Sequence, residues 1–152
     1  MEYTVRTTRY GREETVSVPE EAVYDLGPGI LGFDELRRYA LLPEEGSPLE
    51  WVQAMDDADI AFAVLDPFLF YPDYSFELGD ADVEALGLER PEDARVRVIL
   101  TLHESAEGIT ANLMAPLVLN PRMRRARQVV LQESELPLRF PVLEALQMPM
   151  SA

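Results

Sequence analysis

The feature that most constrains this chain is how often its apolar segments are interrupted. Its 152 residues contain 12 prolines and 8 glycines, spread along the whole length. The apolar runs between them are short, and several alternate with polar residues, which is the pattern of half-buried strands. Strands are expected at residues 3–8, 15–18, 21–26, 39–42, 60–65, 95–103, 110–115, 117–119 and 127–131. Many short strands joined by turns predict a mainly β fold, a small antiparallel β-barrel-like single domain.

The residue patterns of two of these segments indicate how each strand is buried in such a fold. In residues 95–103, apolar side chains occupy alternate positions from Val96 to Leu102, so this strand is expected to bury one face. Residues 60–65 are apolar at every position, which is typical of a central strand that is covered on both faces.

Helix signals are few. Asp80 is suited to cap a short helix over residues 81–86, and Gly87 is suited to end it. Residues 91–93 begin with proline and predict a single helical turn. Residues 47–55 open with a capping-box pattern, which by itself predicts a helix through Met55. Only the segment near residues 80–86 has both a start signal and a stop signal. We therefore expect one short helix there, in an otherwise β-rich chain.

Charge excludes one class of partner. The chain carries 28 acidic and 13 basic residues, a formal net charge of −15. Such a surface repels phosphate backbones, so direct nucleic-acid binding is not expected, and basic partners are favoured. No cysteine, secretory signal or apolar run of about 20 residues is present, so a cytoplasmic protein with no membrane span is expected.

No constellation of residues predicts catalysis, a metal or a cofactor. His103 is the single histidine, and no Gly-x-Ser-x-Gly motif accompanies it. Residues 27–32 have the literal form G-x-G-x-x-G, but Pro28 and the β-rich context favour a backbone turn over a dinucleotide site. The acidic run at residues 56–59 lacks the spacing of an EF-hand and is interpreted as a solvated turn. The prediction is a non-enzymatic protein.

Four arginines gather just after Asn120-Pro121, at positions 122, 124, 125 and 127. A basic hairpin tip is able to contact phosphate. In so acidic a chain, pairing with neighbouring carboxylates or contact with an acidic partner segment is the favoured interpretation.

The segment from Asp66 to Phe76 is the strongest binding candidate. It holds five aromatic residues, two prolines and two aspartates within eleven positions. One interpretation is a loop whose rings complete the core, and the other is a partly exposed aromatic patch with an acidic rim that grips a protein partner. If the segment is extended, adjacent residues point to opposite sides. Phe68 and Phe70 are then expected to pack inward, and Tyr71 and Tyr74 to be reachable from solvent.

Four blocks of the sequence, at residues 29–33, 59–74, 110–121 and 128–131 with 137–139, resemble the FliW family of flagellar assembly factors. Residues 59–74 read DIAFAVLDPFLFYPDY and resemble its signature, and residues 29–33 read GILGF and resemble its Gly-x-x-Gly-Phe turn. Residues 110–121, TANLMAPLVLNP, resemble its Asn-Leu-x-Ala-Pro…Asn-Pro segment. Residues 128–131 and 137–139 resemble its C-terminal block. The resemblance spans about Thr4 to Pro141.

The resemblance also has departures. The family often has glycine where this chain has Ala126, and often histidine where Phe140 stands. Residues 49–53 resemble a strand of the family's barrel, so a strand is expected there in place of the helix that the capping box predicts.

The resemblance implies a function. The resemblance implies a protein with a small β-barrel-like fold and no enzymatic activity. Such a protein binds flagellin in the cytoplasm, and it also binds CsrA, a dimeric translational repressor. Free flagellin competes with CsrA for such a protein. When flagellin is exported, the released protein antagonises CsrA, and flagellin is translated. Two other readings remain open: a small-molecule-binding or hydrolytic β-barrel that uses its interior and His103, and a generic acidic chaperone.

Several expectations follow for this chain. The domain is expected to span residues 1–141, with a C-terminal tail at residues 142–152 that is either a short helix or disordered, and the free protein is expected to be a monomer. The acidic side chains are expected to weaken RNA binding by the repressor at a distance. The residues expected to meet partners are Asp66, Phe68, Phe70, Tyr71, Asp73, Tyr74, Glu44, Glu45, Asp56 and Asp57.

Overall fold

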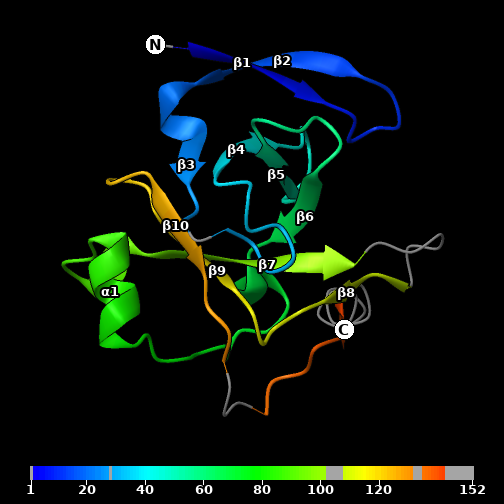
Figure 1. Ribbon diagram of the computed structural model, residues 1–152. Helices are drawn as coiled ribbons and strands as arrows, with labels where there is room; N and C mark the ends of the chain where they lie inside the picture. Colours follow the sequence, from blue (N-terminus) through cyan, green and yellow to red (C-terminus); the bar gives the residue numbers. More distant parts are fainter. Residues whose placement is uncertain (1, 28, 102–107, 132–134, 143–152) are drawn as a thin grey trace.

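A closed barrel forms the centre of the molecule. The computed structural model describes residues 2–27, 29–101, 108–131 and 135–142. The barrel strands are β3 (Val23–Asp25), β4 (Arg38–Pro43), β5 (Glu50–Ala54), β6 (Ala61–Leu65), β7 (Arg95–Thr101), β9 (Leu117–Asn120) and β10 (Arg125–Gln128). They pair in the order β7-β6-β5-β4-β3-β10-β9, and a β7–β9 ladder closes the ring. The expected mainly β, barrel-like fold is confirmed (Figure 1).

Most of the barrel pairs are antiparallel, as expected. The pair between β3 and β10 is parallel and is joined at Arg125 and Asp25. Outside the ring lie a hairpin of β1 (Glu2–Thr7) with β2 (Glu14–Pro19), and two short strands, β8 (Thr110–Ala111) and β11 (Phe140–Pro141). In Figure 1 the hairpin lies above the barrel and α1 lies below and to one side of it.

The barrel interior is filled by apolar side chains. Alternate residues of the strands point inward, and the resulting cluster consists of Tyr24, Leu26, Ile30, Tyr39, Val52, Ala54, Val64, Leu117, Leu119 and Ala126. The space left among these side chains is about 10 Å³, which is close to the minimum that one water molecule needs. The interior therefore holds the fold together and leaves no room for a small-molecule ligand.

The outer faces of the strands are covered by other segments. The β1–β2 hairpin contributes Val5 and Val18 to a cluster that includes Trp51, Leu65 and Val98. Because β6 packs inward through Val64 and outward through Ala63 and Leu65, the expectation of a central strand covered on both faces is confirmed.

The helix forms where it was expected. α1 spans Asp80–Leu86 and ends at Gly87, which adopts a positive φ of 68°, a conformation that glycine accepts without cost. Asp80 is the first helical residue, and Gly79 takes the cap position without a side-chain hydrogen bond, so the expected capping by Asp80 is wrong. Asp80 and Asp82 still lie in the first turn, where the helix dipole favours negative charge.

Several boundaries differ from the expectations. The chain forms 3₁₀ turns at η1 (Glu20–Ala22), η2 (Pro67–Leu69) and η3 (Pro91–Asp93), so the strand expected from residue 21 begins at Val23. The strand expected at residues 127–131 is β10, which begins two residues earlier, at Arg125, and ends at Gln128. The strand at residues 49–53 is confirmed as β5, because tertiary pairing overrides the local capping-box signal.

Asn120 fixes α1 to the barrel. Its side chain is fully buried, and its Nδ2 donates hydrogen bonds to the carbonyls of Leu86 at 2.8 Å and Gly87 at 3.3 Å. These carbonyls belong to the last turn of the helix, where backbone acceptors lack partners within the helix. The Asn-Pro motif thus positions the element that forms one wall of the candidate site.

Candidate functional site

The segment from Asp66 to Phe76, called the aromatic segment from here on, leaves the barrel immediately after β6. Pro67 opens η2, and the Asp66 carboxylate accepts a hydrogen bond of 3.0 Å from the Phe68 backbone amide. Proline at the first helical position and a capping aspartate both favour such a turn. The segment is therefore coiled at its start, whereas the expected directions of its rings assumed an extended backbone.

This turn changes which rings face solvent. Phe68 is 47% exposed and Tyr74 is 2% exposed, so the expectations that Phe68 packs inward and that Tyr74 is reachable from solvent are both wrong. A 3₁₀ turn has three residues per turn and does not alternate sides as a strand does. Phe70 is buried at 5% exposure, as expected, and Tyr71 is half-buried.

Tyr74 is buried because its hydroxyl has a partner inside the protein. The phenol donates a hydrogen bond of 2.6 Å to the backbone carbonyl of Leu113, so the buried oxygen remains satisfied. Burial raises the pKa of Tyr74 above its ordinary value. Tyr71 packs edge-on against Tyr74 and Phe140, with ring centroids 6.1 Å and 5.2 Å away. The interpretation of a loop whose rings complete the core is confirmed for most of the rings, and Phe68 with Leu69 stays exposed. That the exposed part grips a protein partner stays a prediction.

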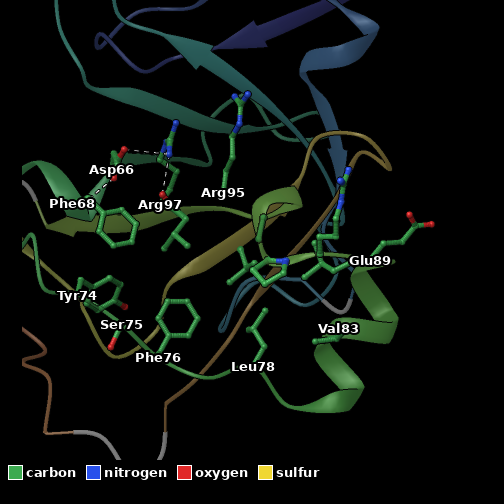
Figure 2. Close-up of a pocket in the computed structure, with 16 residues that line it drawn as sticks. Asp66, Phe68, Tyr74, Ser75, Phe76, Leu78, Val83, Glu89, Arg95 and Arg97 are labelled. Carbon is green, nitrogen blue, oxygen red and sulfur yellow. Dashed lines mark hydrogen bonds and ion pairs between the residues drawn. The ribbon is translucent and has the colours of Figure 1, made fainter.

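An open groove lies beside Phe68 on the outer face of the barrel (Figure 2). Its volume is about 820 Å³, and its floor is formed by Val96 of β7 and Val118 of β9. One wall is the aromatic segment and its continuation, and the other is α1 with the turn after it. The apolar side chains that line these walls are Phe68, Tyr74, Phe76, Leu78, Val83, Leu88, Pro91 and Ala94.

The charged residues that line the groove are Asp66, Glu89, Arg90, Arg95 and Arg97. Figure 2 shows Arg95 and Arg97 extending away from Phe76 and Leu78. Arg97 pairs with Glu50 at 2.6 Å and lies 4.0 Å from Asp66. Neutralised in this way, Arg97 helps to hold β5, β7 and the start of the aromatic segment together.

The other acidic residues expected to meet partners are divided between two ends of the barrel. Glu44 and Glu45 lie in the turn between β4 and β5, at the same end of the barrel as Asp66, which follows β6. Asp56 and Asp57 lie in the turn between β5 and β6, at the opposite end of β5. Asp73 is exposed within the aromatic segment. The structure therefore brings Asp66, Glu44 and Glu45 to one end, and places Asp56 and Asp57 at the other.

The remaining motifs have structural roles. Residues 29–33 form a tight turn in which the Phe33 amide donates to the Ile30 carbonyl at 2.7 Å, and Gly32 adopts a φ of 91°. The turn expected there is confirmed. Of the four clustered arginines, three pair with carboxylates: Arg122 with Glu89 and Asp93, Arg124 with Glu20, and Arg127 with Asp82.

Sites of other kinds are not supported in the described part of the chain. Within residues 2–27, 29–101, 108–131 and 135–142, no group of three histidine, aspartate or glutamate side chains is placed to hold a metal ion. The same residues include no helix long and apolar enough to cross a membrane. His103 lies outside the described residues, as does the tail beyond Val142.

Sequence reasoning missed the far wall and the floor of the groove. Val83 and Leu88 belong to the helix region, and Val96 and Val118 to two strands. The alternating pattern of residues 95–103 signals only that Val96 faces an apolar environment. That this environment is an open groove depends on where α1 docks.

Comparisons with known proteins identify the family. A family model described as FliW protein matches residues 4–142. A flagellar assembly factor FliW of Syntrophus aciditrophicus is 40% identical over 92% of this chain and 87% of its own. One of Treponema denticola is 37% identical over 86% of this chain and 89% of its own. A crystal structure of the flagellar assembly factor FliW superposes with a TM-score of 0.84 at 27% identity, covering 92% of this chain and 96% of that one. The chain belongs to the FliW family.

Proposed function

We propose that this protein is a non-enzymatic, cytoplasmic flagellar assembly factor that works by binding other proteins. It binds flagellin, and it binds and antagonises a CsrA-type translational repressor. Free flagellin competes with the repressor for the protein. Export of flagellin then releases the protein to bind the repressor, and translation of flagellin resumes.

The observation that carries this proposal is the open apolar groove beside Phe68. The interior of the barrel is filled, so the site with room for an occupant lies on the outer surface. Phe68, which lines the groove, is 47% exposed, and its neighbour Leu69 is 49% exposed. Large exposed aromatic side chains next to a hollow are typical of protein-binding surfaces.

The net charge supports antagonism of an RNA-binding protein. A partner that binds RNA presents a basic surface, which the −15 chain attracts. Once bound, the same charge lies close to the RNA site and opposes the approach of phosphate. Binding of repressor and binding of RNA are then coupled without a shared contact.

A competition titration tests the proposal. Purified repressor is bound to a labelled RNA that it recognises, and the protein is added with and without flagellin from the same organism. The proposal expects RNA release by the protein and its reversal by flagellin. No binding to either partner at moderate salt contradicts the proposal.

Charge reversals separate binding from antagonism. Reversal of Glu44, Glu45, Asp56 and Asp57 is expected to weaken RNA release more than it weakens binding of the repressor. The structure sharpens the design, because Glu45 and Asp56 are exposed and lie at opposite ends of β5. Comparing Glu45→Lys with Asp56→Lys shows which end faces the RNA. Equal loss of binding and of RNA release contradicts the electrostatic part of the proposal.

A further inference from the structure

We infer that the groove beside Phe68 takes a basic, amphipathic polypeptide segment, whose apolar side chains enter the groove and whose lysines or arginines meet carboxylates along its walls. The inference rests on the proposed function, because it names the kind of partner segment that fits that site. Its basis is the combination of an apolar lining with unpaired carboxylates next to the walls of the groove.

The walls carry a large share of the charge of the protein. Residues 66–93 supply the aromatic segment, α1 and η3, and they contain nine carboxylates and one arginine, a net charge of −8 within a chain of −15. Arg95 and Arg97, which also line the groove, bring the net charge of residues 66–97 to −6. Five of the nine are exposed and make no ion pair with any arginine of the described residues: Asp73, Glu77, Asp80, Glu84 and Glu92. These carboxylates are available to a partner.

Two of these five carboxylates line a hollow next to the groove, and the other three are sequence neighbours of residues that line the groove. Glu77 lies between Phe76 and Leu78, which both line it. Asp80 and Glu84 line a second hollow of about 570 Å³, which shares Val83, Leu88 and Glu89 with the first. Met123, 41% exposed, also lines this second hollow. The apolar track thus continues past α1, with unpaired carboxylates beside it over both hollows.

Charge complementarity therefore selects the occupant. Arg90, Arg95 and Arg97 also line the groove, but Arg90 pairs with Asp93 and Arg97 with Glu50. An acidic segment would therefore meet five unpaired carboxylates next to the walls, against the one guanidinium of Arg95, which has no ion pair within the described residues. Such a surplus of like charge is destabilising at close range. An uncharged apolar segment would leave the carboxylates unpaired, and some of them partly desolvated. A segment with an apolar stripe flanked by cations satisfies both features, and electrostatic attraction accelerates its encounter with the protein.

A model peptide tests the inference without any natural partner. The probe is a 15-residue helical peptide of leucine and lysine, with leucine on one face, and the comparison peptide has glutamate in place of each lysine. The inference expects amide chemical-shift changes at residues 66–97 with the lysine peptide and none with the glutamate peptide. Shifts spread over the whole acidic surface, or equal binding of both peptides, would overturn it.

Matched variants extend the test to flagellin and the repressor. Glu77→Lys/Glu84→Lys reverses two exposed charges at the walls, and Glu21→Lys/Glu35→Lys makes the same change in net charge at two exposed positions away from them. We expect the first variant to weaken binding of at least one partner by about tenfold at low salt, and the second to leave binding close to wild type. The difference should shrink as salt rises.

The apolar contribution has its own pair of variants. Phe68→Ala removes an exposed ring at the groove, and Leu31→Ala removes a side chain that is 75% exposed on a distant turn. Loss of binding is expected for the first and not for the second. If wild type binds its partners but both groove variants bind equally well, the inference is wrong and the proposed function stands. If wild type binds neither partner, the proposed function fails, and the peptide experiment still decides the inference.

Discussion

Replacing Phe68 and Phe70 separately by alanine distinguishes the binding side of the aromatic segment from its core side. Phe70 is 5% exposed and stacks on Phe140, with ring centroids 5.7 Å apart. Phe68 is 47% exposed and contacts Tyr74 edge-on at 6.2 Å. Truncating a buried phenylalanine costs about 3–5 kcal/mol, because the transfer term and the cavity add. Truncating a half-exposed ring is expected to cost about 1 kcal/mol or less.

Urea unfolding monitored by circular dichroism measures both values. Phe70→Ala should lower the midpoint strongly with the slope unchanged, and a loss of about 3 kcal/mol should lower Tm by roughly 6–12 °C for a chain of this size. Phe68→Ala should stay near wild type in stability and lose partner affinity, by about 2 kcal/mol if the ring is a hot spot. Equal destabilisation by the two substitutions would refute the assignment of one ring to the core and the other to the surface.

Two further predictions concern stability. Asn120→Ala removes the hydrogen bonds that hold the last turn of α1, so we expect a loss of about 1–3 kcal/mol and faster amide exchange in residues 80–87; unchanged exchange there would contradict the docking role. Burial raises the pKa of Tyr39 to about 12 and also raises that of Tyr74, whereas tyrosine in the unfolded chain titrates near about 10. The contribution of these two tyrosines to stability should therefore be fully present below about pH 10 and be lost as pH rises toward 12, and a Tyr39→Phe/Tyr74→Phe variant measured in urea at each pH should show a shallower fall in that range.

The fold was largely predictable because short-range patterns carry it. Alternation along residues 95–101 and the doubly apolar residues 60–65 place β7 and β6 correctly. Gly87 ends α1 through local backbone geometry. Such signals act within one element, so they are visible in the chain itself. Closure of the barrel by β7 and β9, and the parallel pair of β3 with β10, depend on distant segments.

The candidate site was predictable only in part, for the same reason. The aromatic segment is evident from its composition, but which ring faces solvent depends on two details. One is the capping of Phe68 by Asp66, which coils the backbone, and the other is the Leu113 carbonyl, which gives Tyr74 an internal partner from 39 residues away. The groove itself appears only when α1 docks through Asn120.

Hydrogen exchange of the protein with and without a saturating partner tests the central claim most directly. Amide exchange is followed by mass spectrometry for the free chain, the chain with flagellin, and the chain with the repressor. The account predicts added protection in peptides covering residues 66–97, which form the groove, with at least one of the partners. Protection confined to the β1–β2 hairpin or to the β5–β6 turn, with residues 66–97 exchanging as in the free protein, would contradict it.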